Sequence, residues 1–280
     1  MTRIGVVGTE NSHVDHFIRF LNVEHRHPDF TVTALAGGDS ERNRTLAEAG
    51  GIDTIVESSA DLVGQIDAAI ISSRDGGLHA EQALPLIKAG LPVLVDKPLA
   101  AGVRDATTML DAAEESGQVL VSASAVRFAP EIAGLRDASE SRGTTRFVSV
   151  VGAADPDSEY AGLFFYGIHV VETVLELTGD GEFGPVSVSR NDGSITATTQ
   201  INDINVAMTF VLKDDTGQVP FHATVVGRHG IDSTALTLGK DYNAPMLEQF
   251  TAAIESGTTP YSRAKLLRPV ELLESIVSQL

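Results

Sequence analysis

The stretch Leu91-Pro92-Val93-Leu94-Val95-Asp96-Lys97-Pro98 joins an apolar run to an acid, a lysine and a proline. Another apolar run, Ile4-Gly5-Val6-Val7-Gly8, lies at the start of the sequence. Continuous apolar runs of this kind are typical of strands that are buried on both faces of a parallel sheet. A side chain directly after such a strand lies at the edge where open α/β sheets bind ligands. Lys97 is therefore our first candidate functional residue, and the alternative is a solvated lysine at a strand-to-helix turn.

The first 125 residues repeat a pattern of short apolar strands and amphipathic helices. Strands are predicted at residues 3–8, 30–36, 54–56, 68–71, 93–95 and 119–122. Ser12 can cap the first helix, and further helices are predicted at residues 42–49, 60–62, 78–89 and 103–116. Repeated strand–helix units of this length predict a parallel sheet with right-handed crossovers.

The pattern changes after Pro130. Strands that alternate apolar and polar residues are predicted at 145–152, 186–190, 194–200, 205–212, 219–226 and 233–238, and helices at 131–138, 163–177, 245–255 and 266–277. Such alternation indicates an antiparallel sheet with one solvated face, with the apolar helix 163–177 on the other. We therefore predict an α/β chain of two domains. Residues 1–125 form a Rossmann-like, doubly wound parallel sheet, and residues 126–280 form an α+β domain with an open, mostly antiparallel sheet.

The composition restricts the classes of partner. The 280 residues include 20 Lys and Arg against 38 Asp and Glu, a formal net charge of −18. Nucleic acids and anionic membrane surfaces need a basic face, so we expect neither as a partner. The absence of cysteine excludes disulfides, thiolate metal sites and a cysteine nucleophile. Without a signal-peptide core or an apolar run of membrane-spanning length, we expect a cytoplasmic protein.

Three motifs carry a resemblance to a known family. The segment from His79 to Ala100 is similar to a family segment that ends in Glu-Lys-Pro, with Asp96 in place of the glutamate. Arg127-Phe128-Ala129-Pro130 is similar to an Arg-Phe-x-Pro segment. Gly167-Ile168-His169-Val170-Val171-Glu172 is similar to a Gly-x-His-x-x-Asp motif, with a glutamate in place of the aspartate. In this order, over nearly the whole chain, the motifs resemble the glucose–fructose oxidoreductase, inositol dehydrogenase and rhizopine-catabolism (Gfo/Idh/MocA) family.

The resemblance implies an NAD- or NADP-dependent oxidoreductase that transfers hydride to or from a sugar, a polyol or a related small molecule. It implies that Lys97 reaches both cofactor and substrate, that the Lys97–Pro98 peptide is cis, and that His169 lies across the crevice near the reacting hydroxyl. It also implies homo-oligomers that pair the open C-terminal sheets.

The chemistry of the two side chains agrees with this resemblance. A histidine can accept a hydroxyl proton near neutral pH, and a lysine ammonium can stabilise a developing alkoxide. We therefore predict Lys97 and His169 as the catalytic residues. The alternative for His169 is a structural histidine, hydrogen-bonded between a helix and a sheet.

The expected phosphate loop departs from the family's glycine pattern. A dinucleotide fingerprint reads Gly-x-Gly-x-x-Gly after the first strand, whereas this loop reads Gly8-Thr9-Glu10-Asn11-Ser12-His13. Glu10 would repel a pyrophosphate, while Asn11, Ser12 and a protonated His13 could hold it. The predicted cofactor-binding residues are Gly8, Asn11, Ser12, His13, Asp39, Ser72, Ser73, His79, Asp96 and Lys97.

Asp39 follows the second predicted strand, where an acid binds the ribose hydroxyls of NAD and repels the 2′-phosphate of NADP. NAD is therefore favoured over NADP as the cofactor. The alternative is that Asp39 only caps the following helix. No metal site is predicted, because His13 and His16 have no third ligand at motif spacing.

Phe165 is another departure, because the family's dehydrogenases usually carry an aspartate four residues before the motif histidine. Phe165, Glu10 and His13 motivate an alternative hypothesis from a different class. In it, the chain is a relative with poor cofactor binding, and it serves as a small-molecule binding or assembly protein without dehydrogenase activity. The fold alone does not decide between the two hypotheses.

Overall fold

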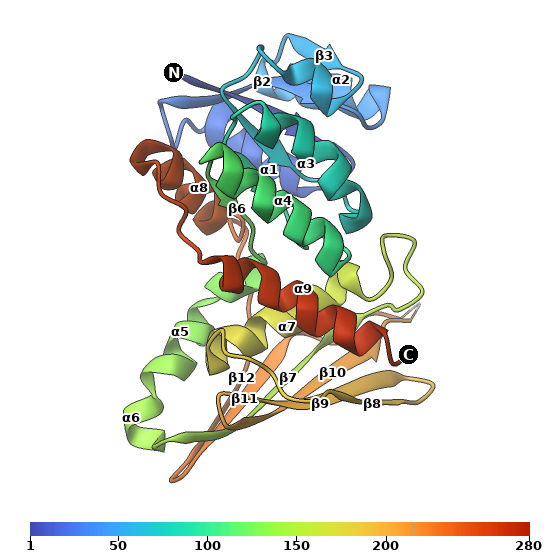
Figure 1. Cartoon of the computed structure of the whole chain (residues 1–280), viewed down its shortest axis with the longest axis vertical. Helices are drawn as coiled ribbons and strands as arrows, with labels where there is room; N and C mark the ends of the chain where they lie inside the picture. Colours follow the sequence, from blue (N-terminus) through green and yellow to red (C-terminus); the bar gives the residue numbers. More distant parts are fainter. Residues whose placement is uncertain (215) are drawn as a thin grey trace. The chain divides into compact units, whose positions relative to one another are not determined.

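The computed structural model describes residues 1–214 and 216–280 (Figure 1). It divides the chain into two compact units. Unit 1 contains Met1–Ala123 and Asn243–Leu266, and unit 2 contains Ser124–Tyr242 and Leu267–Leu280. This grouping differs from the prediction of a single boundary near residue 125, because the segment Asn243–Leu266 packs with unit 1. Within that segment, helix α8 (Ala244–Ser256) buries an apolar face that contacts helix α1 (His13–Ile18).

Unit 1 contains the predicted doubly wound parallel sheet. Its strand order is β3-β2-β1-β4-β5-β6, and every pair is parallel. The strands are β1 (Thr2–Val7), β2 (Phe30–Ala36), β3 (Thr54–Val56), β4 (Ala68–Ile71), β5 (Val93–Val95) and β6 (Leu120–Val121). Most of their side chains are buried, as the continuous apolar runs predicted. The order reverses between β1 and β4, so this is the topological switch point of the sheet.

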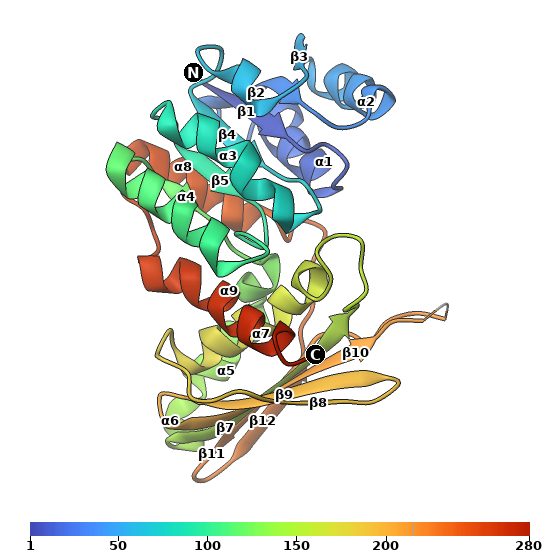
Figure 2. The ribbon, with the colours of Figure 1, turned by 45° about the vertical axis from the view of Figure 1, so that its right-hand side comes forward.

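Helices cover both faces of this sheet. Figures 1 and 2 show α3 (His79–Lys88) and α4 (Val103–Ser116) on one face, and α1 and α2 (Ser40–Gly50) on the other. A π-helix, η1 (Arg19–Val23), extends α1, and the 3₁₀ helices η2 (Ser59–Leu62) and η3 (Gly76–Leu78) precede β4 and α3.

The predicted cap of α1 is wrong. Ser12 occupies the cap position, but its side chain accepts no capping hydrogen bond within the described residues. Its backbone is already helical, whereas a capping side chain needs an extended residue at that position. The side chain of Asn11 takes over part of this role, because its Oδ1 accepts a hydrogen bond from the backbone N–H of His13 at 3.1 Å.

Unit 2 contains a six-stranded sheet with the order β12-β11-β7-β10-β9-β8. The strands are β7 (Thr145–Ala154), β8 (Ser187–Arg190), β9 (Ser194–Ile201), β10 (Ile204–Leu212), β11 (His222–Gly227) and β12 (Ile231–Ala235). All pairs are antiparallel except β7 with β10, which is parallel. The sheet is therefore mostly antiparallel, as predicted. The parallel pair arises because a helix separates β7 from the next strand in the chain, and such crossovers join parallel strands.

Helix α7 (Phe164–Thr178) lies on one face of this sheet, against β7 and β10. The core of unit 2 lies between them and includes Ile168, Val174, Val150 and Phe210. Figure 2 shows no helix on the opposite face. The remaining helical elements are η4 (Ala125–Phe128), α5 (Pro130–Asp137), α6 (Ser139–Arg142) and α9 (Arg263–Val277), the last of which begins in unit 1. Among the described residues, no helix has the length and apolar character needed to cross a membrane.

Candidate functional site

The carboxyl ends of β1, β4 and β5 bring three loops of unit 1 together. Gly8 begins the loop after β1 with a φ of +78°, a conformation that favours glycine. A Cβ atom at Gly8 would lie 2.1 Å from Oγ and 2.4 Å from the backbone N of Ser73, in the loop after β4. The glycine therefore permits contact between neighbouring loops, and the adjacency of β1 and β4 creates that contact.

Asp96 joins the same loops from the end of β5. Its side chain is fully buried, and Oδ2 lies 2.6 Å from Nδ1 of His13, 3.1 Å from Nδ2 of Asn11 and 3.1 Å from Oγ of Ser72. Its other oxygen, Oδ1, accepts a 2.8 Å hydrogen bond from the backbone N–H of Lys97. Burial by itself would raise the pKa of Asp96, but the charge and hydrogen bond of His13 and the charge of Lys97 hold that pKa well below its usual range.

His79 and Ser73 connect the loops at this edge of the sheet. Ring nitrogen Nδ1 of the buried His79 lies 2.7 Å from the carbonyl oxygen of Pro98, and Nε2 lies 2.8 Å from that of Ser73. The Ser73 hydroxyl donates to Oε1 of Gln82 at 2.9 Å. These contacts hold the loops in place, and the roles of His79 and Ser73 in cofactor binding stay a prediction.

The implied cis peptide between Lys97 and Pro98 is present. Lys97 has an exposed fraction of only 5%. The alternative of a solvated surface lysine is therefore wrong, because the residue is almost entirely buried at the carboxyl end of β5. A buried lysine at this edge of a doubly wound sheet is placed where such folds bind ligands.

The more accessible residues around β1 and β2 supply groups that fit a dinucleotide. Ser12 offers an exposed hydroxyl and His13 a partly exposed ring. Asp39 is exposed, and its Oδ1 caps α2 by accepting from the N–H groups of Glu41 and Arg42. The capping role of Asp39 is thus confirmed. Because the cap uses only Oδ1 of Asp39, the prediction that Asp39 also binds the ribose hydroxyls of NAD stays open.

Glu10 has a defined partner outside its own loop. Its Oε1 accepts a 2.9 Å hydrogen bond from the backbone N–H of Arg74, in the loop after β4. The carboxylate therefore bridges two loops at the carboxyl edge of the sheet. The bridge orders the two loops, and the expected repulsion between Glu10 and a pyrophosphate stays a prediction.

In unit 2, three motif residues form one buried network. His169 lies on α7, and its Nδ1 is 2.6 Å from Oγ of Ser124. The backbone N–H of Ser124 donates to Oε2 of Glu172 at 2.8 Å, and Arg127 reaches the same oxygen at 3.2 Å. Arg127 also pairs with Glu176, one turn further along α7. Burial raises the pKa of Glu172, and the charge of Arg127 opposes this effect.

Aromatic rings surround His169. The Phe221 ring lies edge-on at 5.4 Å between centroids, and the Tyr166 ring lies at 5.9 Å. Phe165 contacts Tyr166 at 4.7 Å and Tyr160 at 5.0 Å. The position where family dehydrogenases usually carry an aspartate is thus part of an aromatic cluster that reaches the imidazole.

Sequence reasoning did not find Ser124, Tyr160 or Phe221. Ser124 is 45 residues from its partner His169, so no periodicity relates the two. The proximity of Ser124 to the Arg-Phe-x-Pro motif was the only available signal. No group of three or more His, Asp or Glu side chains in the described part of the chain is placed to hold a metal ion.

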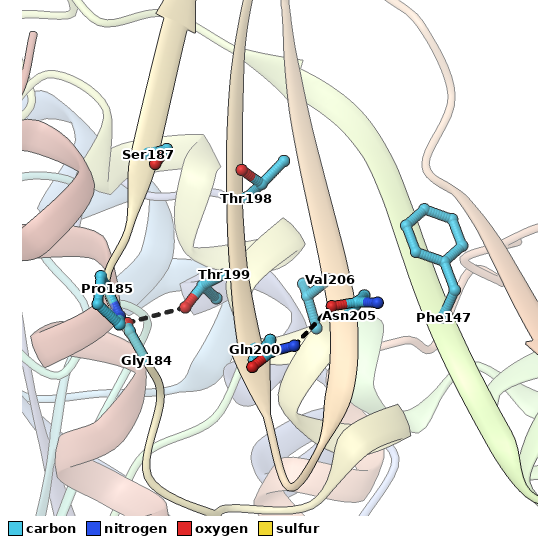
Figure 3. Close-up of a pocket in the computed structure, with 9 residues that line it drawn as sticks. All are labelled: Phe147, Gly184, Pro185, Ser187, Thr198, Thr199, Gln200, Asn205 and Val206. Carbon is cyan, nitrogen blue, oxygen red and sulfur yellow. Dashed lines mark hydrogen bonds between the residues drawn. The ribbon is translucent and has the colours of Figure 1, made fainter.

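Two pockets are lined by other residues. The first has a volume of about 400 Å³ and lies in unit 2 (Figure 3), where Thr199 donates to the carbonyl of Gly184 at 2.9 Å and Gln200 donates to Asn205 at 2.9 Å. It is lined by Phe147, Gly184, Pro185, Ser187, Thr198, Thr199, Gln200, Asn205 and Val206. A smaller pocket of about 260 Å³ lies in unit 1 beside α4. Neither contains a predicted site residue, and the first has no charged side chain in its lining.

A doubly wound sheet with polar loops and a buried lysine at its carboxyl edge has the architecture of dinucleotide-dependent oxidoreductases. Residues 2–124 match a family model described as an oxidoreductase family with an NAD-binding Rossmann fold. This match covers the N-terminal part of the chain and agrees with the resemblance to the Gfo/Idh/MocA family that the three sequence motifs carry.

Two curated relatives are enzymes of sugars and polyols. The chain is 39% identical over 108 residues to the 1,5-anhydro-D-fructose reductase of Ensifer adhaerens, covering 38% of this chain and 32% of the relative. It is 33% identical over 127 residues to inositol 2-dehydrogenase 3 of Saccharopolyspora erythraea, covering 45% of this chain and 36% of the relative. The aligned parts span about half or less of the curated relatives that the chain matches.

The fold similarity extends over the whole chain. The crystal structure of GenD2 from gentamicin A biosynthesis, in complex with NAD, matches with a TM-score of 0.87. The match covers 99% of this chain and 93% of GenD2, at 18% sequence identity. At this identity the similarity establishes the fold and carries no residue roles.

Proposed function

We propose that the chain is an NAD(P)-dependent oxidoreductase that transfers hydride to or from a sugar, a polyol or a related small molecule. The main supporting observation is the burial of Lys97 at the carboxyl end of β5, next to an Asp96 network that connects the loops after β1 and β4. A lysine at this edge is placed where open α/β sheets bind their ligands.

The residues of unit 1 divide into two groups in this proposal. Ser12, His13 and Asp39 contact the dinucleotide, and Lys97 reaches its nicotinamide end. The residues that support them are Gly8, Asn11, Ser72, Ser73, His79 and Asp96, whose contacts hold the loops in place. The negative charge of Asp39 favours NAD over NADP, because a 2′-phosphate would lie close to it.

Lys97 and His169 act on the reacting oxygen of the substrate. The bound nicotinamide supplies or accepts the hydride. The ammonium group of Lys97 stabilises the alkoxide that forms as a carbonyl is reduced, or as a hydroxyl loses its proton. His169 contributes from α7 of unit 2, where the aromatic cluster replaces the polar partner usual in family dehydrogenases.

A cofactor titration tests this proposal. Purified protein is titrated with NADH and with NADPH while cofactor fluorescence is followed. We expect saturable binding with a preference for NADH, and a Lys97→Ala variant that still binds cofactor but loses turnover by orders of magnitude. Absence of binding of either cofactor at millimolar concentration would contradict the oxidoreductase. It would favour the alternative, a small-molecule binding or assembly protein, which Glu10 and Phe165 motivate.

We also propose that the chain forms homo-oligomers through the uncovered face of the unit 2 sheet, with a second copy as the occupant. This face carries small side chains such as Thr198, Thr209 and Ala207, which suit flat packing of one sheet on another. A Thr209→Arg variant should shift the mass in light scattering towards the monomer. An Asp137→Arg variant on the exposed end of α5 should not. An unchanged mass for Thr209→Arg, or a monomeric parent protein, would contradict this proposal.

A further inference from the structure

Ser124 has a hydrogen-bonding pattern that restricts the proton of His169. Ser124 is fully buried, and its Oγ accepts a hydrogen bond from the backbone N–H of Val126 at 3.2 Å. The same Oγ lies 2.6 Å from Nδ1 of His169. Across residues 1–214 and 216–280, these two groups are the only hydrogen-bonding partners of the Ser124 hydroxyl.

Only one placement of the Ser124 hydroxyl hydrogen satisfies the contacts of Oγ with both Val126 and His169. If Nδ1 of His169 carried a hydrogen and donated it to Ser124, the Ser124 hydroxyl would have no acceptor among the described residues. An unsatisfied buried donor destabilises the fold. If Ser124 instead donates its hydrogen to Nδ1, the Ser124 hydroxyl both accepts and donates a hydrogen bond, and Nδ1 accepts one. The neutral imidazole then carries its single hydrogen on Nε2.

Helix α7 holds Ser124 in the orientation in which its hydroxyl can donate to Nδ1 of His169. His169 and Glu172 are three residues apart on α7, so their side chains share one face of the helix. Glu172 accepts from the Ser124 backbone N–H at 2.8 Å, and His169 accepts from the Ser124 hydroxyl. Arg127, in turn, neutralises Glu172 at 3.2 Å. One serine is therefore anchored at both its backbone and its side chain by successive turns of the same helix.

We propose that Ser124 is a positioning residue that keeps His169 in the Nε2–H form, so that His169 donates a hydrogen bond to the substrate oxygen and does not accept its proton. This inference rests on the proposed oxidoreductase function. It changes the role of His169 from the proton acceptor expected from sequence to a neutral donor that polarises a carbonyl group and stabilises the alkoxide.

In this proposal the proton is carried by Lys97. In the reducing direction, the carbonyl carbon would gain the hydride that a bound nicotinamide supplies, and the π electrons of the C=O bond would become a lone pair on oxygen. The Nε2–H group of His169 would stabilise this alkoxide. The alkoxide would take a proton from the Lys97 ammonium, which would become an amine and regain a proton from water. Oxidation would run through the same steps in reverse, with the neutral Lys97 amine as the base.

Nuclear magnetic resonance tests the tautomer without cofactor or substrate. The sequence has 8 histidines, so the ¹⁵N-labelled ring signals of His169 are assigned by their loss in a His169→Gln variant. We expect the parent protein to show a hydrogen on Nε2 and an unprotonated Nδ1. Ser124→Ala should give a mixture of tautomers, and Ser124→Thr should restore the parent pattern. A hydrogen on Nδ1 in the parent protein overturns the inference, whether or not any variant folds.

Kinetics separates positioning from structural support. Ser124→Ala should lower kcat by about tenfold or more and change its pH profile, whereas Ser189→Ala, an exposed serine of β8, should change neither. The dissociation constant of NADH should stay the same in Ser124→Ala, because its contacts lie in unit 1. If NADH does not bind the parent protein, the proposed function fails. If NADH binds but Ser124→Ala leaves the His169 signals and the pH profile unchanged, only the present inference fails.

Discussion

Nδ1 of His13 lies 2.6 Å from Oδ2 of Asp96, and this contact joins two positions at which the chain departs from its family's pattern. His13 stands where the glycine fingerprint has its last glycine, and Asp96 stands where the family has a glutamate. The carboxylate of Asp96 is buried, and it accepts a hydrogen bond from the His13 ring, which occupies the position of the missing glycine. The loop is therefore held by a specific side-chain contact in place of the close packing that a glycine would allow.

The His13–Asp96 contact should contribute to stability in a pH-dependent way. Asp96→Asn removes the charge partner of His13, and we expect a loss of about 1.5–3 kcal/mol at pH 7, the range for hydrogen bonds to a charged group. Because the folded-state pKa of Asp96 is depressed, this contribution is fully present above the unfolded-state pKa of about 4 and is lost as the pH falls further.

Urea unfolding at a series of pH values measures this effect. The difference between parent and Asp96→Asn should be constant near neutral pH and should shrink as the pH falls below about 4. Asp53→Asn, an exposed aspartate of the same unit, is the control and should change the free energy of unfolding by less than about 0.5 kcal/mol. A loss that is equal at all pH values would show that the ion pair is not its cause.

Removing the charge of Glu10 should strengthen cofactor binding. Glu10→Gln keeps an oxygen that can accept from the Arg74 N–H, so the bridge between the loops survives. It removes one negative charge near the pyrophosphate, worth about 1 kcal/mol, or a factor of about 5 in Kd. NADH fluorescence titration at low and high salt measures the gain, which should shrink with salt. Glu48→Gln, an exposed residue of α2, makes the same change in net charge and should have little effect.

Asp39 allows its two roles to be separated by substitution. Asn and Ser also cap helices well, so Asp39→Asn and Asp39→Ser should retain the stability of α2 within about 0.5 kcal/mol. Both remove the charge that repels a 2′-phosphate, so the Kd of NADPH relative to NADH should fall by about tenfold, equivalent to about 1.4 kcal/mol. Thermal unfolding and paired titrations measure the two effects. If the variants lose stability while the ratio of the Kd values for NADPH and NADH stays unchanged, Asp39 only caps the helix and does not select the cofactor.

Arg127 should be far more important to stability than Arg136, although both pair with Glu176. The Arg127 side chain is 5% exposed, whereas that of Arg136 is 51% exposed. Arg127→Met leaves the buried Glu172 without its cation and removes one of the two cations of Glu176, and we expect a cost of about 3–5 kcal/mol. Arg136→Met should cost less than about 1 kcal/mol, because an exposed pair is screened by water.

The loss in Arg127→Met should also depend on pH. Burial raises the pKa of Glu172, so the folded state holds the proton more tightly than the unfolded state. The stability of a protein with such a group falls as the pH rises above the unfolded-state pKa of about 4.3. The variant should therefore be closest to the parent in acid and furthest from it at neutral pH. Equal costs for Arg127→Met and Arg136→Met would contradict the buried network.

Much of unit 1 could be predicted from local sequence. Apolar runs such as Val93–Val95 have no polar alternation, so they predicted strands buried on both faces and hence a parallel sheet. The place of Lys97 at the carboxyl end of β5 followed from that prediction. The mixed sheet of unit 2 was harder, because alternation indicates one solvated face but does not reveal which strands are neighbours. The parallel pairing of β7 with β10 was therefore not foreseen.

The association of Asn243–Leu266 with unit 1 also required the tertiary structure. An amphipathic helix shows in its sequence that it has an apolar face, but it does not show which surface will cover that face. The same limit applies to polar side chains. His79 was predicted to bind a cofactor, and only the structure showed that both of its ring nitrogens lie at backbone carbonyls.

The amino-acid sequence alone determined the class of fold, and its motifs predicted the family resemblance and the lysine and histidine on which the proposed chemistry depends. These follow from short-range periodicity and from motifs, which neighbouring residues encode. Only the tertiary structure decided that His13 meets Asp96 and that Ser124 meets His169. Each of these contacts joins residues that are far apart in the chain. They form because strand order and helix packing choose which loops meet, and buried polar groups must then find partners among those loops.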